Sequence, residues 1–388
     1  MKIQIVSDLG PPVFGGAETY VMELGKELIK MKNEVYWNHM KISNAKYYEK
    51  IEGINCYRSW VPLVGNRLIF ARLLYSIFMF PQVLRISKRT DVIQFNSFVA
   101  AVTGWIAGKF SKKPYLLMVH EFFGDLWNIV GKNYFEKIVY PEVEKFISKS
   151  HYPQIICPSN YTKNILVKLG VDEKIINVIY HGINHSIFHP GYEPVLKKKF
   201  PDKFIIGWAG RIGLSRTKNL KTLLEAFKIV KNEISNSILA FDGSNFNYLI
   251  PTIKKVGLEL NKDVIYTGKS LTEELPYFYS SCDIFATSSL SEGFGLSAVE
   301  AQACGVPVVC FNTGALPEVV KDDVSGILVK DFTPEALAEG IIKILQDEDL
   351  RLKLSKNAQE WSKSFTWRDS AIKHLEVYEK CIELSKNK

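Results

Sequence analysis

The sequence is poor in cysteine and contains no long apolar run. Its six cysteines are scattered over 388 residues, with neither a CxxC pair nor the spacing of metal ligands, which predicts reduced thiols and a cytoplasmic protein. The best candidate for a membrane helix, residues 73–84, has 12 uncharged residues, whereas a spanning helix needs about 18 or more. The N-terminus also lacks the apolar core of a signal peptide. We therefore expect neither a transmembrane segment nor export by that route.

Glycine, proline and charge show no extreme either. The 25 Gly, 16 Pro, 47% hydrophobic and 23% charged residues exclude collagen, coiled-coil and disordered chains. The net charge of +8 is uneven, because residues 1–194 hold 23 Lys and Arg against 16 Asp and Glu, and residues 195–388 hold 26 against 25. This asymmetry fits an anionic partner of the first half, such as a phosphate-bearing acceptor or an acidic membrane surface. It fits equally well a charge that only keeps the protein soluble.

Strand-like apolar runs alternate with amphipathic segments of helical length, which predicts α/β units around parallel sheets. We expect twelve strands, at residues 2–6, 34–37, 92–95, 115–119, 154–157 and 176–179, and at 204–209, 237–241, 264–266, 284–286, 306–310 and 326–328. Together they predict two Rossmann-like, doubly wound domains over 1–190 and 200–365, joined by a linker at about 188–199. Residues 366–388 form an expected C-terminal helix that packs back over the junction.

Two loops have the composition of anion sites. Gly15 and Gly16 follow the first expected strand and begin a helix whose apolar positions include Tyr20. Glycine lets the backbone approach a ligand closely, and the N–H groups of a helix start favour a diphosphate. A glycine turn before a helix is also common without any ligand, and the absence of GxGxxG counts against nicotinamide binding.

The second loop, after the expected strand at 204–209, carries Arg211 and Lys218. Arg offers a bidentate fork and Lys a point charge, which together suit a diphosphate. A solvated basic loop, in which Arg216 serves as well, is the alternative.

The most informative segment places Glu292 and Glu300 on either side of a glycine-rich turn at a helix start. Carboxylates accept hydrogen bonds from ligand hydroxyls, and the unpaired N–H groups of the turn hold anions or sugar oxygens. This E-x7-E pattern resembles the signature of the retaining, nucleotide-sugar-dependent glycosyltransferases of family 4, which have the GT-B fold. The resemblance is strong over 204–330 and looser before, where it rests on residues 15–18, 119–121, 158–162 and 181–184, with Glu121 and Asn184 replacing the usual Asp.

The resemblance implies two Rossmann-like domains facing across a cleft and a hexosyltransferase-type enzyme. Such an enzyme moves a sugar from a UDP- or GDP-sugar to a hydroxyl of a glycan or lipid-linked saccharide, without a metal, a further cofactor or nucleic acid. It implies these roles: Glu300 for the donor ribose; Glu292 for the donor sugar; the backbone of Phe294, Gly295 and Leu296 for sugar and phosphate; Arg211 and Lys218 for the diphosphate; Gly15, Gly16 and His120 next to the donor sugar; and Gly268 and Lys269 for the base.

Several alternatives stay open. A glycosidase needs two carboxyl groups roughly 5 to 9.5 Å apart, and eight residues along one helix would separate Glu292 from Glu300 by about 12 Å. The alternative enzymes are a transferase or synthase that acts on a soluble sugar, and a nucleotide-sugar epimerase or a phosphorylase on the same fold. The alternative of a different class is a non-catalytic carbohydrate-binding or membrane-docking module. Asp347-Glu348-Asp349 matches the metal-binding D-x-D pattern but is interpreted as surface, since Arg211 and Lys218 can neutralise the diphosphate.

The basic, aromatic-rich stretch from Arg67 to Arg89 is typical of an interfacial helix and equally of a buried helix with arginines at its rim. In the first case the enzyme attaches to an anionic membrane surface at the inner face of the membrane. Phe122, Phe123 and Trp127 either line an acceptor cleft or only pack.

Overall fold

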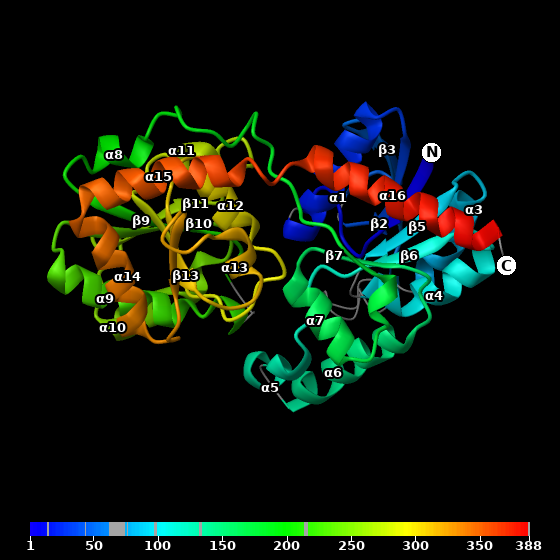
Figure 1. Cartoon of the computed structure of the whole chain (residues 1–388), viewed down its shortest axis with the longest axis horizontal. Helices are drawn as coiled ribbons and strands as arrows, with labels where there is room; N and C mark the ends of the chain where they lie inside the picture. Colours follow the sequence, from blue (N-terminus) through cyan, green and yellow to red (C-terminus); the bar gives the residue numbers. More distant parts are fainter. Residues whose placement is uncertain are drawn as a thin grey trace. The chain divides into compact units, whose positions relative to one another are not determined.

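The fold is known from a computed structural model that describes residues 1–13, 15–42, 44–61, 74–75, 77–96, 99–131, 134–212 and 216–386. It consists of two compact units, each built on its own sheet (Figure 1). Unit 1 comprises Met1–Trp127, Asn133–Gly182 and Trp367–Lys388, and unit 2 comprises Asn128–Lys132 and Ile183–Thr366.

The sheet of unit 1 has eight strands among the described residues, in the order β3-β4-β2-β1-β5-β6-β7-β8. All neighbours are parallel except β3 and β4, which form an antiparallel hairpin. Their bounds are β1 Lys2–Val6, β2 Glu34–Met40, β3 Tyr48–Ile51, β4 Ile54–Ser59, β5 Val92–Asn96, β6 Tyr115–Met118, β7 Ile155–Cys157 and β8 Ile176–Val178.

Helices cover this sheet on both faces. Right-handed crossovers that run in opposite directions from β1 and β5 place α1 and α4 on opposite faces. The C-terminal helix α16 packs beside α1, as Figure 1 shows in red and blue, and over β5 and β6. The helix α3 packs against α4, and α4 packs against α6. The helices of unit 1 are α1 Gly16–Lys30, α3 Phe80–Ser87, α4 Val99–Ser111, α6 Tyr134–Lys149, α7 Asn160–Lys168 and α16 Trp367–Lys386. The short helix α5, Trp127–Val130, belongs to unit 2 except for its first residue.

The sheet of unit 2 is entirely parallel over the described strands, in the order β11-β10-β9-β12-β13-β14. The strands are β9 Phe204–Ala209, β10 Ser237–Asp242, β11 Val264–Gly268, β12 Ile284–Thr287, β13 Val308–Phe311 and β14 Gly326–Val329. The helices are α8 Val195–Lys199, α9 Leu220–Glu233, α10 Ile250–Val256, α11 Leu275–Tyr279, α12 Leu296–Ala303, α13 Leu316–Val319, α14 Pro334–Gln346 and α15 Glu348–Ser362.

Most strands of both sheets are buried apolar runs, as parallel strands covered on two faces require; the antiparallel edge strand β3 is half-exposed. All twelve expected strands are present, with ends that differ by at most three residues. In unit 2, α9 and α14 pack together on one side of the sheet through a core that includes Leu223, Phe227 and Ile341. None of the helices that the structure describes combines the length and apolar character needed to cross a bilayer.

The chain passes from unit 1 to unit 2 between Gly182 and Ile183, several residues before the expected linker. The segment from 188 to 199 is instead packed into unit 2. The Phe188 ring lies 6.2 Å from that of Tyr279, and the backbone N–H of Leu196 donates to the Ser281 hydroxyl at 3.0 Å. Its proline and glycine content therefore marks a packed surface segment of unit 2.

Candidate active site

The sheet of unit 2 reverses its order between β9 and β12. The chain runs outward from β9 through β10 to β11, then returns to add β12, β13 and β14 on the other side of β9. Since β9 and β12 are parallel neighbours, with Ile206 opposite Ile284, the loops at their carboxyl ends meet. Open α/β sheets bind ligands at such a point. The loop after β9 carries Arg211 and Lys218, and the loop after β12 carries Glu292.

Hydrogen bonds join these two loops. The N–H of Leu290 donates to the carbonyl oxygen of Thr217 at 2.7 Å. The Ser288 hydroxyl donates to the carbonyl oxygens of Lys218 at 3.1 Å and Asn219 at 2.8 Å. Asn219 has a left-handed backbone, with φ of +46°, and precedes α9. The backbone that carries Lys218 is thus fixed to the loop that carries Glu292.

The two predicted side chains on these loops touch each other. Lys218 Nζ lies 2.5 Å from Glu292 Oε1, and the Ser289 hydroxyl donates to the same oxygen at 2.7 Å. Thr287 in turn lies 3.0 Å from Ser289, between hydroxyl oxygens. In a nucleotide sugar one oxygen joins the sugar to the phosphate, so a lysine for the phosphate and a glutamate for the sugar have to be adjacent. The structure brings this pair together.

Two glycines shape the turn around Glu292. Gly314 has φ of +62°, and a Cβ at this position would lie 2.6 Å from the backbone nitrogen of Glu292. Gly295, with φ of +98°, immediately precedes α12. The first N–H groups of a helix have no partner within the helix, so the predicted backbone donors around Leu296 lie at a helix start. Phe294 is buried, with its ring 5.7 Å from that of Phe365.

Glu300 lies on α12 and has a partner of its own. The hydroxyl of the buried Tyr279, at the end of α11, donates to Glu300 Oε2 at 2.8 Å. Burial raises the pKa of Glu300 to about 7, although the Tyr279 hydrogen bond acts in the opposite direction. Glu292 precedes α12, so the helical spacing that predicted a separation of about 12 Å does not apply to this pair.

The predicted base site lies at the ends of β10 and β11. Asp242 is buried and accepts three hydrogen bonds, from the Thr267 hydroxyl at 2.7 Å and from the backbone N–H and hydroxyl of Ser270 at 3.1 and 2.7 Å. These bonds hold the loop that contains Gly268 and Lys269. Gly268 has φ of +113°, and Lys269 is exposed.

Two further backbone contacts bring this loop to the β9 loop. The N–H of Gly243 donates to the carbonyl oxygen of Gly268 at 2.7 Å, and the N–H of Gly210 donates to that of Asp242 at 3.0 Å. A Cβ on Gly243 would lie 1.7 Å from the Gly210 oxygen, so only glycine fits there. Arg211 directly follows Gly210 in the sequence, and its side chain is exposed. The predicted diphosphate and base residues are therefore neighbours in unit 2.

Unit 1 carries the other predicted residues at the carboxyl edge of its own sheet. Gly15 caps the N-terminus of α1 without a side-chain hydrogen bond, and Gly16 is exposed. Asp8, at the end of β1, accepts the N–H of Ala100 at the start of α4 at 2.8 Å. The glycine loop thus follows β1, next to β5, where this sheet reverses its order.

His120 follows β6 and packs against two aromatic rings of unit 1. Its ring centroid lies 4.8 Å from that of Tyr20, edge to face, and 5.8 Å from that of His181. Burial, with a smaller contribution from His374, lowers the pKa of His120 to about 3. His120 is therefore a neutral imidazole near neutral pH.

Comparison with protein families decides the classification of this chain. Residues 14–187 match the model named Glycosyltransferase Family 4, and residues 196–361 match the model named Glycosyl transferases group 1. The chain is a family 4 glycosyltransferase. An uncharacterised glycosyltransferase of Methanocaldococcus jannaschii is 26% identical to it over 391 residues, which cover 96% of each chain. A D-inositol 3-phosphate glycosyltransferase of Corynebacterium kroppenstedtii is 30% identical over 56% of this chain and 51% of the relative.

Solved structures confirm the GT-B fold of this glycosyltransferase. Sucrose-phosphate synthase from Thermosynechococcus elongatus superposes with a TM-score of 0.83 at 23% identity, over 98% of both chains. The Anabaena protein HepE, solved in complex with UDP and glucose, superposes with a TM-score of 0.80 at 21% identity, over 98% of this chain and 100% of the other. The expected family, fold and enzyme class are confirmed.

The structure of the glycosyltransferase adds a carboxylate that the sequence did not single out. Glu144, on α6, is buried and accepts the backbone N–H groups of Phe123 and Gly124 at 2.9 and 2.8 Å. Burial raises the pKa of Glu144 to about 7, against these hydrogen bonds. It holds the segment that follows His120. Of the aromatic residues there, Phe122 is fully buried, and the rings of Phe123 and Trp127 are 4.8 Å apart.

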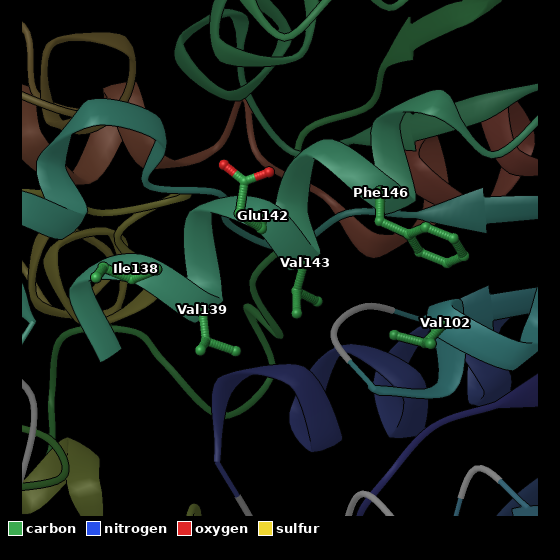
Figure 2. A pocket seen from close by; sticks show the side chains of 6 residues that line it. All are labelled: Val102, Ile138, Val139, Glu142, Val143 and Phe146. Atoms are coloured by element: carbon green, nitrogen blue, oxygen red, sulfur yellow. The ribbon is translucent and has the colours of Figure 1, made fainter. Parts of the chain in front are cut away.

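A hollow of about 470 Å³ lies between α4 and α6 of the glycosyltransferase. Its walls are apolar except for one residue, and they are formed by Val102, Ile138, Val139, Glu142, Val143 and Phe146. Figure 2 shows Val139 and Val143 pointing to one side and the carboxylate of Glu142 pointing to the other. The hollow contains none of the residues predicted for the donor.

Two further predicted features can be placed. Asp347 caps α15 by accepting the N–H of Leu350 at 2.8 Å, in an exposed position. Within the described ranges, no group of three or more His, Cys, Asp and Glu side chains is arranged to hold a metal ion. Of the stretch Arg67–Arg89, residues 67–73 and 76 lie outside the described residues. In the rest, Tyr75 and Met79 are buried, and Arg85, Lys88 and Arg89 are exposed.

Proposed function

We propose that this glycosyltransferase moves a hexose from a UDP- or GDP-sugar to an acceptor hydroxyl with retention of the anomeric configuration. The contact between Lys218 and Glu292 is the observation that carries the proposal. The contact places the cation that we propose to bind phosphate next to the carboxylate that we propose to bind the sugar, as a donor whose sugar and phosphate share one oxygen would require. HepE, a structural neighbour with the same fold, binds UDP and glucose, which supports a nucleotide-sugar donor for this chain.

In the proposed reaction the bond between the sugar C1 and the phosphate oxygen breaks, and a bond from C1 to the acceptor oxygen forms on the same face. The acceptor proton passes to the departing phosphate oxygen, through an oxocarbenium-like state. Arg211 and Lys218 stabilise the charge that develops on the diphosphate. Glu292 binds the hydroxyls of the sugar, and no enzyme nucleophile is required.

The remaining predicted residues position the donor. Glu300, held by the hydroxyl of Tyr279, accepts hydrogen bonds from the ribose hydroxyls. The backbone N–H groups around Phe294, Gly295 and Leu296 donate to sugar and phosphate oxygens. The loop at Gly268 and Lys269, fixed by Asp242, binds the base. From unit 1, His120 and the Gly15–Gly16 loop contact the donor sugar. This use of two cations makes the reaction independent of a metal, which is tested by adding a chelator and then magnesium.

The acceptor is proposed to be a lipid-linked saccharide or lipid phosphate at the inner face of the membrane. Arg85 on α3 is exposed, as are Lys88 and Arg89 just after it, and Ile77 and Phe78 just before this helix are 65% and 41% exposed. Each Lys or Arg at an anionic surface contributes about 1 kcal/mol, so three of them give weak, salt-sensitive attachment. Phe110 on α4, whose ring lies 5.8 Å from that of Phe80 on α3, and Phe146 on α6, which lines the hollow, are exposed by 69% and 49% and add apolar surface.

A soluble acceptor is the second candidate. It is favoured by the similarity to D-inositol 3-phosphate glycosyltransferases and to sucrose-phosphate synthase, whose names specify a small sugar-like acceptor in the first case and a small sugar phosphate as the product in the second. The apolar side chains of α4 and α6 would then be ordinary surface residues.

The deciding experiment incubates the enzyme with a panel of nucleotide sugars and with lipid-linked and soluble acceptors, followed by mass spectrometry of the products. NMR of the product then gives its anomeric configuration. Absence of UDP or GDP binding in calorimetric titrations would overturn the proposal, and an inverted product would overturn its mechanism.

Membrane attachment is tested by co-sedimentation with vesicles of neutral lipid, with and without phosphatidylglycerol. Replacing Arg85, Lys88 and Arg89 by Gln should abolish binding to the anionic vesicles. The control variant replaces Lys353, Lys356 and Lys363, three exposed lysines of unit 2, and loses the same charge. No binding at low salt, together with full activity on a soluble acceptor, would exclude the membrane.

A further inference from the structure

A buried polar network links the C-terminal helix α16 to the neighbourhood of His120. His374, on α16, is fully buried, and its Nε2 lies 2.7 Å from the hydroxyl of Tyr20 on α1. The Nδ1 atom of His374 lies 2.7 Å from the carbonyl oxygen of Ser370, one turn earlier. A carbonyl only accepts, so Nδ1 carries the proton. Nε2 of the neutral ring is then an acceptor, and Tyr20 donates to it.

The oxygen of Tyr20 is also held from the sheet. Gln94, on β5, donates its amide N–H to this oxygen at 3.1 Å, and its carbonyl oxygen accepts the hydroxyl of Tyr378 on α16 at 2.7 Å. Two residues of α16 and one of the sheet therefore determine where the Tyr20 hydroxyl lies. Buried polar groups in such a satisfied network have one preferred arrangement.

The ring of Tyr20 lies against the ring of the predicted sugar-contacting histidine. It makes an edge-to-face contact with His120, with centroids 4.8 Å apart. It also contacts His181, at 4.7 Å. Trp367, the first residue of α16, lies against His181 from another side, with centroids 5.8 Å apart and planes inclined by 22°. Burial lowers the pKa of all three histidines, so no charge repulsion opens the group near neutral pH.

We propose that Tyr20 is a positioning residue for His120, and that α16 sets the position of Tyr20 through His374. This inference rests on the proposed contact of His120 with the donor sugar. Tyr20 itself touches neither the donor nor the acceptor. Residues separated by 354 positions thus cooperate, and the last helix of the chain takes part in catalysis although it carries none of the predicted donor-binding residues.

The test compares three variants. Tyr20→Phe keeps the ring and removes the hydroxyl, and His374→Phe removes the acceptor on α16 as a second route to the same loss. Tyr152→Phe is the control, because Tyr152 is another buried tyrosine of unit 1 whose hydroxyl donates to the Ala101 carbonyl at 2.8 Å, away from His120. Circular dichroism and thermal unfolding establish which variants fold.

Three readouts distinguish positioning from stability: kcat, nucleotide affinity and the NMR signals of His120. Misplacement of a contacting group by about 1 Å can cost 10²-fold, so kcat should fall by about 10- to 100-fold in both test variants. The affinity for UDP or GDP should stay within twofold, since the predicted nucleotide site lies in unit 2. Histidine side-chain NMR, with His120 assigned through His120→Asn, should show displaced His120 signals in both test variants. Tyr152→Phe should leave kcat and these signals unchanged.

The NMR readout does not depend on activity. Folded test variants with undisplaced His120 signals, or with kcat within twofold of wild type, would overturn the inference. A wild-type enzyme that transfers no sugar from any donor would instead overturn the proposed function, whatever the spectra show.

Discussion

Glu300 offers the most direct quantitative test of the donor site. Binding of ribose hydroxyls by a carboxylate requires its ionised form, and burial raises the pKa of Glu300 to about 7. Donor affinity should therefore rise as pH increases through 7. At pH 6 only about one tenth of Glu300 is ionised, so the donor should bind about tenfold more weakly than at high pH, a difference of about 1.36 kcal/mol. Tyr279 donates its hydroxyl to Glu300 Oε2 at 2.8 Å and stabilises the ionised form.

Tyr279→Phe removes this stabilisation and should move the midpoint upward. A hydrogen bond to a charged group contributes about 1.5–3 kcal/mol, which is equivalent to about one to two pKa units. The midpoint of nucleotide binding should therefore move from about 7 to about 8–9. Near pH 7.5 the variant should bind roughly tenfold more weakly than wild type, and most of the loss should disappear at pH 9.5.

The assay is calorimetric titration with UDP and GDP between pH 6 and pH 9.5. Glu300→Gln serves as the control, because its side chain stays neutral and any remaining pH dependence belongs to the nucleotide phosphates. A wild-type affinity that follows the Glu300→Gln profile, or an unshifted midpoint in Tyr279→Phe, would refute the proposed role of Glu300.

Four other substitutions test contacts of unit 2. Glu300→Ala and Arg211→Ala should each weaken binding of the nucleoside diphosphate by about 1.5–3 kcal/mol, measured by calorimetry at pH 8; unchanged affinity in both would contradict the assignment. Glu292→Ala should mainly lower kcat for transfer, with UDP or GDP affinity nearly kept, since the nucleotide alone lacks the sugar. Gly314→Ala should lower the free energy of unfolding by about 1–3 kcal/mol and abolish most activity, because the added Cβ would lie 2.6 Å from the Glu292 nitrogen. The control is Gly191→Ala, which should lose stability without losing activity, because Gly191 has φ of +105° and open space around it.

The sequence predicted the sheets well because their strands are buried on both faces. Such strands appear as continuous runs of Val, Ile and Leu between helical segments. The hairpin of β3 and β4 was missed, since β3 is a half-exposed edge strand with Glu49 and Lys50 at its centre. Its two-residue turn has Glu52 and Gly53 at φ of +49° and +83°. Asn or Asp usually occupies the first position of such a turn, so the usual signal was absent.

The site was predictable where its residues lie close together in the sequence. Glu292 and Glu300 share one loop and helix, and Arg211 and Lys218 share another loop. Tyr279 and Asp242 could not be identified in this way, because their partners belong to other elements and a tyrosine or aspartate at a strand or helix end has many structural uses. The Tyr20–His374 contact joins helices at opposite ends of the chain, which periodicity alone cannot reveal.

Unit 1 should also be unusually sensitive to acid. It buries four histidines, and burial lowers the pKa of His39 and His120 to about 3, of His374 to about 4, and that of His181 well below its ordinary value. In the unfolded chain all four take up a proton near pH 6.5, so stability present above this pH is lost as pH falls. Glu144 opposes this trend, because burial raises its pKa to about 7, and a proton bound in the folded state near pH 5 adds stability there.

The histidines outweigh the glutamate by about three protons near pH 5. Each proton contributes about 1.4 kcal/mol per pH unit, so unit 1 should lose roughly 4 kcal/mol between pH 6 and pH 5, a large share of the stability of a typical domain. Urea unfolding of the full chain carrying Glu300→Gln, in which the raised pKa of Glu300 in unit 2 no longer contributes, measures the slope across this range by near-UV circular dichroism. His374→Phe should lower the slope by one proton, because His374 is buried and its pKa is lowered to about 4. Two results would contradict this prediction: a free energy of unfolding that is flat from pH 7 to pH 5, or a slope that His374→Phe leaves unchanged. Either would mean that these imidazoles are already hydrated in the folded protein. The packing of Tyr20 between His120, His181 and His374 would then lose its physical basis.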